Sequence, residues 1–287
     1  MTKSTAKNKI LIGAHMSIAG GLHKAFDRAI ETDSTTMQIF THSNRQWAFK
    51  DIPQEEIEKF KAAQQETAII PVVHASYLIN LCSESQEVQQ KSKVALEKEL
   101  HVAEELGIEY VVVHPGYGSL SKSVLINNLA KYVNQILDKT GKRASILFEN
   151  MAGQKNAICS SFEELADVYD KIENKARIGF CLDTCHAWAF GYDFSTEEGF
   201  KKMLKNFDSI IGINKLKVIH LNDSKKSLAS KADRHERIGK GTIGLYAFEL
   251  IMNDKKLADI PKILEIPFDT IKDYKHDIDL LRSLIRP

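Results

Sequence analysis

The chain has 287 residues, of which 43% are hydrophobic and 27% are charged, and its net charge at pH 7 is only +1. A chain of this length can bury a sizeable core. The balanced charge excludes a polycation, so any affinity for nucleic acid must come from a local basic surface.

The first residues and the cysteines indicate where the protein resides. Residues 1–9 are polar and lack the apolar segment of a signal peptide. No apolar run approaches the ~20 residues needed to span a bilayer. Cys82, Cys159, Cys181 and Cys185 are too few for the disulfide framework of a small secreted protein. We therefore expect a cytoplasmic protein with reduced thiols and no membrane partner.

Short apolar runs alternate along the chain with segments of helical periodicity. Strands are predicted at residues 10–15, 36–40, 69–74, 110–114, 145–149, 178–183, 218–221 and 262–265. Helices are predicted at residues 22–30, 55–65, 87–106, 121–138, 161–171, 196–207, 245–253 and 274–284.

Several residues mark the ends of these elements. Pro53 stands where the first turn of a helix tolerates proline, and Gly107 follows the helix 87–106 as a terminating glycine. Ser161 and Glu164 have the spacing of a capping box. Pro71 is unusual for a central strand, because proline cannot donate a hydrogen bond to its neighbour.

Eight strands that alternate with eight helices predict an α/β protein with a parallel sheet and crossover helices. The number of repeats and the length match a (β/α)8 TIM barrel, for which ~250 residues is typical. No linker interrupts the pattern, so we expect residues 1–287 to form a single domain. Periodicity alone also permits an open, doubly wound sheet.

Residues that can bind a metal stand at the ends of strands three to eight or just beyond them. They are His74, His114, Glu149, Asp183, His186, His220, Asp233, His235 and Glu265. A single histidine at a strand end is usually structural, but here every strand from the third to the eighth supplies a candidate. Barrel enzymes place their catalytic groups at the C-terminal ends of the strands, so the pattern favours a closed barrel with a metal site at this mouth.

The composition of this set indicates the metal. Five imidazoles suit zinc better than magnesium or calcium, which prefer oxygen ligands. One zinc ion takes about four ligands, so nine candidates predict more than one ion and shared carboxylates.

Other histidines and cysteines offer alternatives. A local zinc site from Cys181, Cys185 and His186 is possible, although such cysteines more often pack as small hydrophobic residues. We expect His15 to line the mouth without binding metal. We expect the remaining histidines to be solvated; these are His23, His42, His101 and His276.

Basic and aromatic residues accompany the metal candidates. A basic segment flanks Asp233 and His235; it contains Lys225, Lys226, Lys231, Arg234, Arg237 and Lys240. Runs of this kind are usually solvated, but beside a metal site they suit a phosphodiester substrate. Arg45 and Trp47 follow the second strand, and Tyr77 follows the third. These side chains can serve packing or can enter a base stack, and the sequence leaves both open.

These residues lie in motifs that resemble the endonuclease IV family of zinc-dependent abasic-site (AP) DNA repair endonucleases. The motifs follow the family's order over nearly the whole chain: GAHMS at 13–17, HASYLINL at 74–81, HPG at 114–116, ENMAGQ at 149–154, DTCHA at 183–187, GYD at 191–193, HLNDSK at 220–225, DRH at 233–235, GKGTIG at 239–244 and LE at 264–265. The sequence departs from the family's usual residues at Ala75, Met151 and Lys155, which affects loop details and DNA binding but no candidate ligand.

The resemblance implies a protein with three zinc ions that cleaves duplex DNA. Because no exposed apolar stripe in the sequence demands a partner, we expect a monomer. By analogy, His74, His114 and Glu149 hold one ion. Glu149 also bridges to a second ion with Asp183, His220 and Glu265, and the third is held by His186, Asp233 and His235. The expected contacts to DNA are Arg45, Tyr77, Lys225, Arg234 and Lys240.

The implied reaction is hydrolysis of the phosphodiester 5′ to an abasic site, after the abasic nucleotide flips out of the duplex. It leaves a 3′-hydroxyl and a 5′-deoxyribose phosphate. Glu149 and Glu265 are the expected catalytic carboxylates. The alternatives are a metal-dependent sugar isomerase or epimerase on the same barrel, and a damage-binding module in which zinc is structural.

Overall fold

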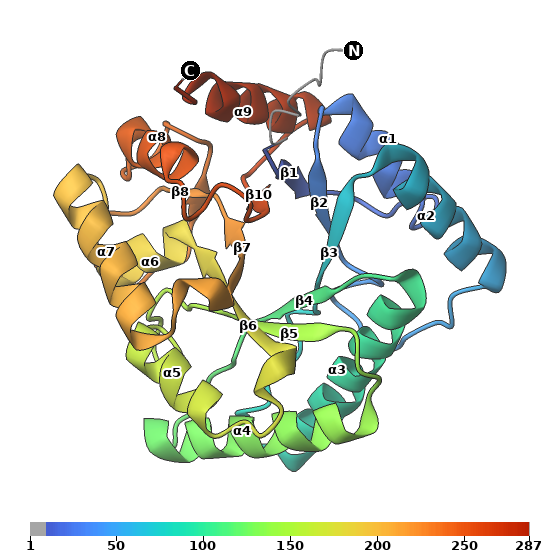
Figure 1. Ribbon diagram of the computed structural model, residues 1–287. Coiled ribbons are helices and arrows are strands. Elements are labelled where there is room, and N and C mark those ends of the chain that lie inside the picture. The colour runs from blue at the N-terminus through green and yellow to red at the C-terminus, as the bar shows by residue number, and fades with distance from the viewer. Residues whose placement is uncertain (1–9, 287) are drawn as a thin grey trace, which may run out of the picture.

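A computed structural model describes residues 10–286 and shows a closed barrel of eight parallel strands inside a ring of helices (Figure 1). The barrel strands are β1 (Ile12–His15), β2 (Thr36–Ile39), β3 (Ile70–His74), β4 (Tyr110–Val113), β5 (Ser145–Glu149), β6 (Ile178–Asp183), β7 (Leu216–His220) and β10 (Lys262–Leu264). The helices are α1 (Lys24–Glu31), α2 (Gln54–Thr67), α3 (Gln86–Leu106), α4 (Lys122–Lys139), α5 (Phe162–Asp170), α6 (Thr184–Phe190), α7 (Glu197–Ile210), α8 (Leu245–Asn253) and α9 (Ile271–Ser283).

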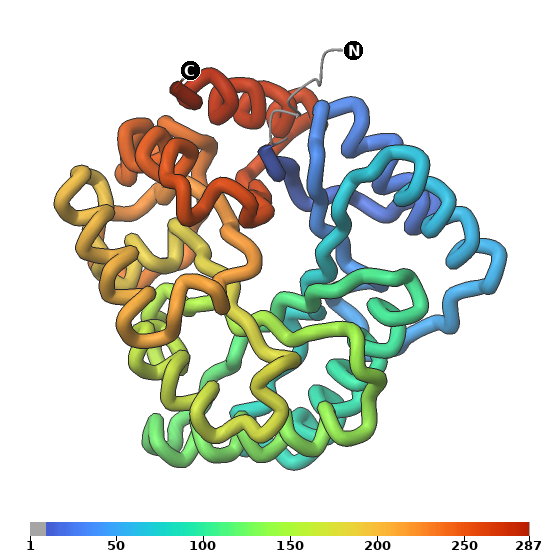
Figure 2. Tube along the Cα trace, in the orientation of Figure 1, coloured from blue at the N-terminus to red at the C-terminus, as the bar shows by residue number. Residues whose placement is uncertain are grey.

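The first and last barrel strands pair directly and close the sheet. Ile12 of β1 is in register with Lys262 of β10, and Gly13 is in register with Ile263. On its other side β1 pairs with β2, and the remaining strands pair in chain order. In the trace of Figure 2, α9 lies beside α1 and completes the outer ring. The closed topology confirms the predicted (β/α)8 barrel and excludes the open sheet.

The predicted strands and helices are present with ends shifted by a few residues, but shorter elements were missed. Helix α6 begins directly after β6, with Asp183 as its N-cap residue. No polar segment separates the two elements, and most of α6 is buried, so the sequence shows no boundary. Also missed were the two-stranded sheet of β8 (Asp223–Ser224) and β9 (His235–Glu236) and the short helices η1 (Lys175–Arg177) and η2 (Ile213–Lys215).

The expected helix ends are present. Gly107 follows α3 in the left-handed conformation with φ of 75°, and the Ser161 hydroxyl accepts the N–H of Glu164 at 3.2 Å. Pro71 is accommodated because β3 pairs with β4 only from Val73 onward. The Ile70 N–H donates to the carbonyl of Thr35 on the β2 side. Successive backbone nitrogens of a strand face opposite sides, so the nitrogen of Pro71 faces β4, where β3 is not yet paired and no hydrogen bond is lost.

Apolar side chains fill the inside of the barrel beneath the mouth. They are Val72, Val112, Leu147, Cys181, Val218 and Ile263, all 1% exposed or less. A second, larger core lies between the strands and the helices. Within residues 10–286, no helix combines the length and apolarity needed to cross a membrane. The polar sequence at residues 1–9, interpreted above as no signal peptide, lies outside the described residues.

Gly13 gives a test of the close pairing between β1 and β2. A Cβ atom at this position would lie 1.7 Å from the backbone oxygen of Thr36, so Gly13→Ala must displace a strand. We expect it to lower the free energy of unfolding by about 3 kcal/mol or more. Chemical denaturation of Gly13→Ala, beside wild type, measures the change.

Gly107→Ala is the matched control, because an added Cβ at Gly107 has no atom within 4 Å and meets only the cost of a positive φ. That cost is about 1 kcal/mol. Equal losses for the two variants would contradict the close strand approach at Gly13.

Candidate metal centre

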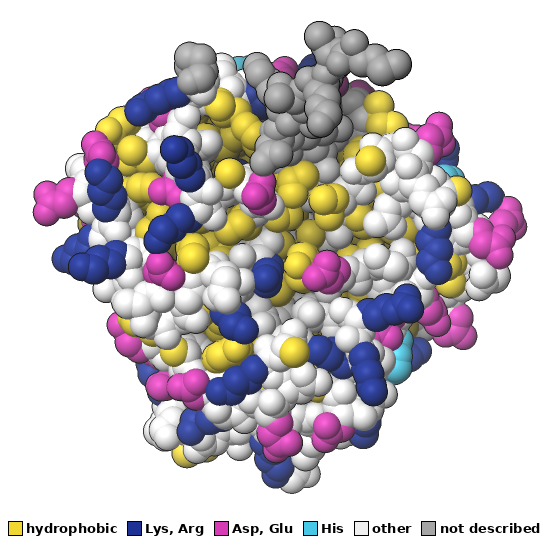
Figure 3. Space-filling view, viewed as in Figure 1, with side chains coloured by type: hydrophobic (Ala, Val, Ile, Leu, Met, Phe, Trp, Pro, Cys, Tyr) yellow, Lys and Arg dark blue, Asp and Glu magenta, His cyan; other side chains and the backbone are white. Residues whose placement is uncertain are grey.

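The nine predicted metal-binding residues meet at one end of the barrel, and we call them the mouth cluster. They lie at the C-terminal ends of β3, β5, β6 and β7, in α6, in and beside β9, and just after β4 and β10; they are His74, His114, Glu149, Asp183, His186, His220, Asp233, His235 and Glu265. Figure 3 shows a face where lysine, arginine and acidic side chains are interspersed and no histidines gather at the centre, so the cluster is not presented there.

Glu149 lies at the centre of the mouth cluster. Its Oε2 atom is 3.4 Å from His74 Nε2 and 3.2 Å from His114 Nε2. Its Oε1 atom is 3.1 Å from His186 Nδ1 and 3.3 Å from His220 Nδ1. One fully buried carboxylate therefore contacts four imidazoles on four different elements.

Two further carboxylates extend the cluster on the β7 and β10 side. His220 Nδ1 lies 3.1 Å from Glu265 Oε2 and 3.9 Å from Asp183 Oδ2. On the β9 side, Asp233 lies between two imidazoles, 3.2 Å from His186 Nε2 and 3.2 Å from His235 Nε2. The structure thus brings all nine residues together.

Potential ligand atoms form overlapping sets, each small enough to surround one ion. His74, His114 and Glu149 form one set, and Glu149, Asp183, His220 and Glu265 form a second. A third set contains Asp183, His186 and His235, with Asp233 next to both histidines. Within each set the ligand atoms lie within 4.8 Å of one another.

Each of four histidines uses one ring nitrogen in a hydrogen bond that orients the ring, and in His186, His220 and His235 the other nitrogen faces the cluster without a partner among residues 10–286. His74 Nδ1 donates to the carbonyl of Ala75, His186 Nδ1 to Asn150, and His235 Nδ1 to Glu265, at 2.7 to 3.0 Å. His220 donates from the opposite nitrogen, Nε2, to Gln38 Oε1 at 2.8 Å.

Four buried atoms that point into the cluster have no hydrogen-bond partner among the described residues. They are Glu149 Oε1, His186 Nε2, His220 Nδ1 and His235 Nε2. Buried polar atoms rarely lack partners, and a carboxylate oxygen repels a facing imidazole lone pair unless a proton or a metal ion lies between them. A divalent cation that accepts lone pairs from both would satisfy them, so the donor set fits a metal.

Three amides that the sequence analysis missed orient these ligands. Asn150 and Asn222 hold Asp183: Asn150 Oδ1 accepts the Asp183 N–H at 2.7 Å, and Asn222 Nδ2 donates to Asp183 Oδ2 at 2.7 Å. Gln38 Nε2 donates to Glu265 Oε1 at 2.6 Å. Asn150 and Asn222 lie within the motifs at 149–154 and 220–225, and Gln38 lies within the second predicted strand. Amides are too common in sequences for these positions to indicate a role in orienting ligands.

Opposing charges shift the pKa of several groups of the cluster, among them His235 and Glu149, toward the ionised form. Burial alone would lower the pKa of His235, but the carboxylates of Asp183 and Asp233 raise it to about 9. Burial alone would raise the pKa of Glu149, but His220 and His114 hold it well below its usual value. Without a metal, protons on His186, His220 and His235 therefore take the place of cations.

Two histidines outside the cluster differ from the prediction that they are solvated. His23 is half-buried and contacts Glu56 at 2.8 Å, and His42 lies 3.4 Å from the buried Glu99. Both form pairs between elements that are distant in sequence, which periodicity cannot reveal. His101 and His276 are exposed as expected, and His15 lies at the mouth, 3.7 Å from Glu265.

The cysteines do not form the local site considered as an alternative. Cys181 lies among the apolar side chains inside the barrel, as a small hydrophobic residue. Burial raises the pKa of Cys181 and of Cys185 to about 12, so both thiols stay protonated at neutral pH. Cys185 Sγ does lie near Asp233 and His235, at the edge of the third set.

Most of the basic segment beside the cluster is exposed, but one arginine is engaged elsewhere. Lys225, Arg234 and Lys240 are exposed. Arg237 is paired with Asp273 and Asp277 of α9, with Nη2 2.7 Å from Asp277, so it does not extend the basic surface. The sequence could not distinguish this ion pair from a solvated arginine.

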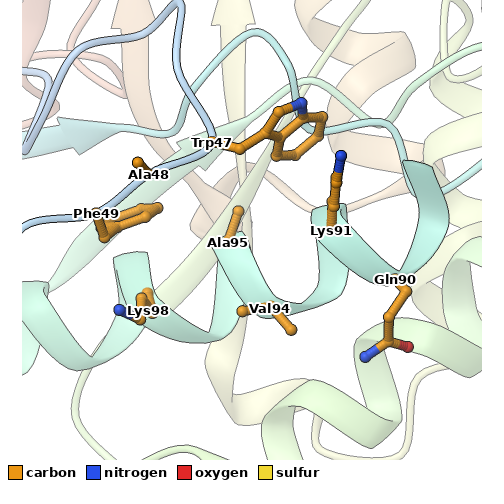
Figure 4. A pocket seen from close by; sticks show the side chains of 8 residues that line it. All are labelled: Trp47, Ala48, Phe49, Gln90, Lys91, Val94, Ala95 and Lys98. Carbon is orange, nitrogen blue, oxygen red and sulfur yellow. The ribbon is translucent and has the colours of Figure 1, made fainter. Parts of the chain in front are cut away.

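The side chains of Arg45, Trp47 and Tyr77, which follow β2 and β3, differ in whether they are exposed or packed on a helix. Arg45 is exposed, and Tyr77 is 51% exposed with its ring 5.1 Å from His74 and 5.5 Å from His114. Trp47, by contrast, lies with Phe49 along the surface of α3, where they line a pocket of about 360 Å³ (Figure 4). Of the two roles left open by the sequence, Trp47 therefore serves packing on α3, whereas the side chains of Arg45 and Tyr77 are accessible to a ligand.

The fold and the mouth cluster together define a metal-binding (β/α)8 barrel protein. The profile of the family described as "Xylose isomerase-like TIM barrel" matches residues 26–284. The protein named "Probable endonuclease 4" of Halothermothrix orenii is 42% identical over 277 residues, which cover 96% of this chain and 99% of that protein. The "Apurinic-apyrimidinic endonuclease" of Caenorhabditis elegans is 40% identical over 92% of this chain and 68% of that protein.

A solved structure agrees with these relatives. The crystal structure of endonuclease IV from Thermus thermophilus matches 95% of this chain and 98% of that chain, with 34% identity and a TM-score of 0.86. The chain belongs to the endonuclease IV family, a family of nucleases, as its motifs indicated.

The protons held by the mouth cluster predict how metal affinity depends on pH. Because the pKa of His235 is raised from 6.5 to about 9, its proton stabilises the metal-free fold below pH 6.5, and this contribution is lost as the pH rises through about 9. A metal must displace this proton. Its affinity should therefore rise between pH 6.5 and 9, by about tenfold per pH unit for each displaced proton.

Titration of chelator-stripped protein with zinc at pH 6.5, 7.5 and 9 measures this dependence, with the affinity corrected for buffer complexes. Calorimetry in buffers of different ionisation enthalpy counts the protons released. An affinity that does not change with pH would contradict the protonated cluster.

Proposed function

We propose that the protein is a DNA repair endonuclease that hydrolyses the phosphodiester 5′ to abasic sites in duplex DNA, using three zinc ions. The observation that carries this proposal is the sharing of Glu149 between two sets of potential ligands, beside a third set and a basic surface. The names of its relatives, which include an apurinic-apyrimidinic endonuclease, support the choice of substrate.

We assign one proposed ion to each set of residues. His74, His114 and Glu149 would hold one ion, and Glu149, Asp183, His220 and Glu265 a second. His186, Asp233 and His235 would hold the third, with Asp183 near it. The unpartnered atoms and the predominance of imidazoles support zinc over magnesium or calcium.

The chemistry that must be supplied is attack on a phosphodiester, which repels nucleophiles and has a poor leaving group. Zinc, when bound, lowers the pKa of a coordinated water to about 7 and stabilises negative charge on oxygen. Glu149, held by four imidazoles, would fix the spacing between neighbouring sets. Glu265 is held by Gln38, and its pKa is lowered because His220, His15 and His74 together outweigh the effect of burial. It is therefore ionised at neutral pH and can orient the attacking water or accept its proton.

The mouth has the shape and charge for a nucleotide displaced from DNA. Two hollows flank Tyr77: one of about 400 Å³ beside Glu265 and one of about 220 Å³ beside His114. An abasic nucleotide that has left the duplex would enter this region, while Arg45 and Tyr77 fill the space it leaves. Lys225, Arg234 and Lys240 would contact backbone phosphates.

Hydrolysis at the 5′ side would leave a 3′-hydroxyl and a 5′-deoxyribose phosphate. The alternative, a sugar isomerase or epimerase on the same barrel, fits the description of the matching family. It leaves the exposed Arg45 and the basic segment without a role, and its chemistry uses fewer ions. Nicking of an abasic duplex, assayed beside sugar interconversion, distinguishes the two.

The proposal includes a monomer that acts in the cytoplasm. All residues of the mouth cluster come from one chain, so the site needs no second copy. All four cysteines are free and buried in the structure of residues 10–286, which suits a reducing compartment.

Glu149→Gln tests the shared carboxylate. The change keeps the size of the side chain but removes the charge that two ions would share, so we expect a loss of at least about 10³-fold in kcat/KM on an abasic duplex. The variant should also bind less zinc. Single-turnover nicking and metal analysis measure both effects, and chelator treatment of wild type should abolish cleavage.

Glu164→Gln is the matched control, because Glu164 is also a shielded carboxylate, but on α5, where it accepts the Ser160 N–H at 3.1 Å. It should keep wild-type activity. Full activity of Glu149→Gln, or product ends other than a 3′-hydroxyl and a 5′-deoxyribose phosphate, would contradict the proposed chemistry.

Lys225→Ala and Lys240→Ala test the phosphate contacts. Each should weaken binding to duplex DNA regardless of its sequence, and should reduce the slope of log K against log salt concentration by about 1. Anisotropy titrations between 50 and 200 mM salt, roughly the range where such slopes are clear, measure this. Lys139→Ala, at an exposed lysine of α4 paired with Glu97, should change neither quantity.

A further inference from the structure

The two side chains expected to enter DNA stand on separate loops. Arg45 lies in the loop between β2 and α2, and Tyr77 lies in the loop between β3 and α3. Both side chains are exposed. If they enter the duplex at one lesion, their loops must keep a fixed spacing, because a displacement of about 1 Å can cost 10²-fold in rate.

A single buried carboxylate contacts both loops from beneath. Glu99 of α3 is 0% exposed, and its Oε2 accepts the hydroxyl of Thr41 at 2.6 Å. Its Oε1 accepts the backbone N–H of Ser76 at 3.3 Å and lies 3.4 Å from His42 Nδ1. Thr41 and His42 begin the Arg45 loop, and Ser76 immediately precedes Tyr77.

The two loops are also joined directly to each other. The Ser76 hydroxyl donates to the carbonyl of Asn44, next to Arg45, at 3.0 Å. The ring of Phe40, at the base of the first loop, lies 5.4 Å from the ring of Tyr77. These contacts make the loops one unit, and the carboxyl group of Glu99 lies at its base.

The outer side of the same unit rests on α3 as well. The ring of His42 is 3.7 Å from the ring of Phe49, and Lys98 Nζ lies 5.6 Å from the Phe49 ring. Figure 4 shows Phe49 and Trp47 along α3. His42 therefore lies between the carboxylate inside and the aromatic ring outside, and the segment is held on α3 from both sides.

Stability alone does not account for a carboxylate at this position. Among residues 10–286, no lysine or arginine pairs with Glu99, and burial of a carboxylate costs free energy that two hydrogen bonds and the contact with His42 offset only in part. An apolar side chain would fill the space at lower cost. A carboxylate differs in being directional, because its two oxygens fix donors from two loops at defined positions.

We propose that Glu99 is a positioning residue for substrate recognition, which locks the Arg45 loop to the Tyr77 loop so that both side chains enter the duplex at one lesion. This rests on the proposed function. Glu99 touches neither the substrate nor the mouth cluster, so it acts on binding rather than on hydrolysis.

Glu99→Ala and Glu99→Gln test this role with the full-length, zinc-loaded enzyme. Glu99→Ala should raise KM for an abasic duplex by about tenfold, with kcat at saturation within twofold of wild type and zinc content unchanged. Glu99→Gln keeps one acceptor oxygen for Thr41 or Ser76, so its KM should lie between those of wild type and Glu99→Ala. An intermediate KM for Glu99→Gln, with kcat unchanged, would not follow if the variants simply failed to fold.

Glu104→Ala is the matched control. Glu104 is on the same helix, and its carboxylate also accepts backbone N–H groups of a loop, from Arg143 at 2.9 Å and Ala144 at 3.2 Å, but after α4. It should leave KM unchanged. A fluorescent base analogue next to the lesion gives a second measurement: its unstacking at saturating enzyme should be smaller for Glu99→Ala than for wild type and Glu104→Ala.

The outcomes separate the two proposals. Wild type that does not nick abasic duplex overturns the proposed function, and the role of Glu99 with it. Wild type that nicks, with a KM unchanged in Glu99→Ala or raised equally in Glu104→Ala, overturns only the role of Glu99. A fall in kcat or zinc content at unchanged KM also overturns it, because Glu99 would then act on the metal centre.

Discussion

The structure depends on the burial of one carboxylate, Glu149, among four imidazoles. A charge at 0% exposure is tolerated only where neighbouring groups compensate it, and here they come from β3, the end of β4, α6 and β7. Elements that are far apart in sequence must converge for this compensation, so the mouth cluster requires the closed barrel. The atoms left without partners are those that a shared cation would bind.

Much of this arrangement was predictable because it repeats. Each strand is a short apolar run, and the residue at or just beyond its end faces the mouth, so the barrel topology converts spacing along the chain into proximity. That is why Glu149 and Asp183, 34 residues apart, could be expected to meet. The spacing of the residues does not show which candidate ligands share an ion. The resemblance of the motifs to the family suggested that grouping.

Other features were not predictable because they depend on contacts between single side chains. Gln38 looks like any polar residue in a strand, yet it orients both Glu265 and His220. His42 looked like a solvated loop residue, yet Glu99, far along the chain, contacts it from beneath. Helix α6 follows β6 without a polar break, so no pattern separated them. Arg237 likewise gave no sign of its ion pairs with α9.

The apolar side chains inside the barrel determine how substrate and products reach and leave the site. Because Val72, Val112, Leu147, Cys181, Val218 and Ile263 fill the interior, no passage leads from the reaction centre to the opposite end of the molecule. The reactant, water and the cleaved ends must all enter and leave through the mouth of the barrel. A polymer can thus be cleaved at an internal position without threading through the barrel, provided that it binds at the rim of the mouth and dissociates from the same side.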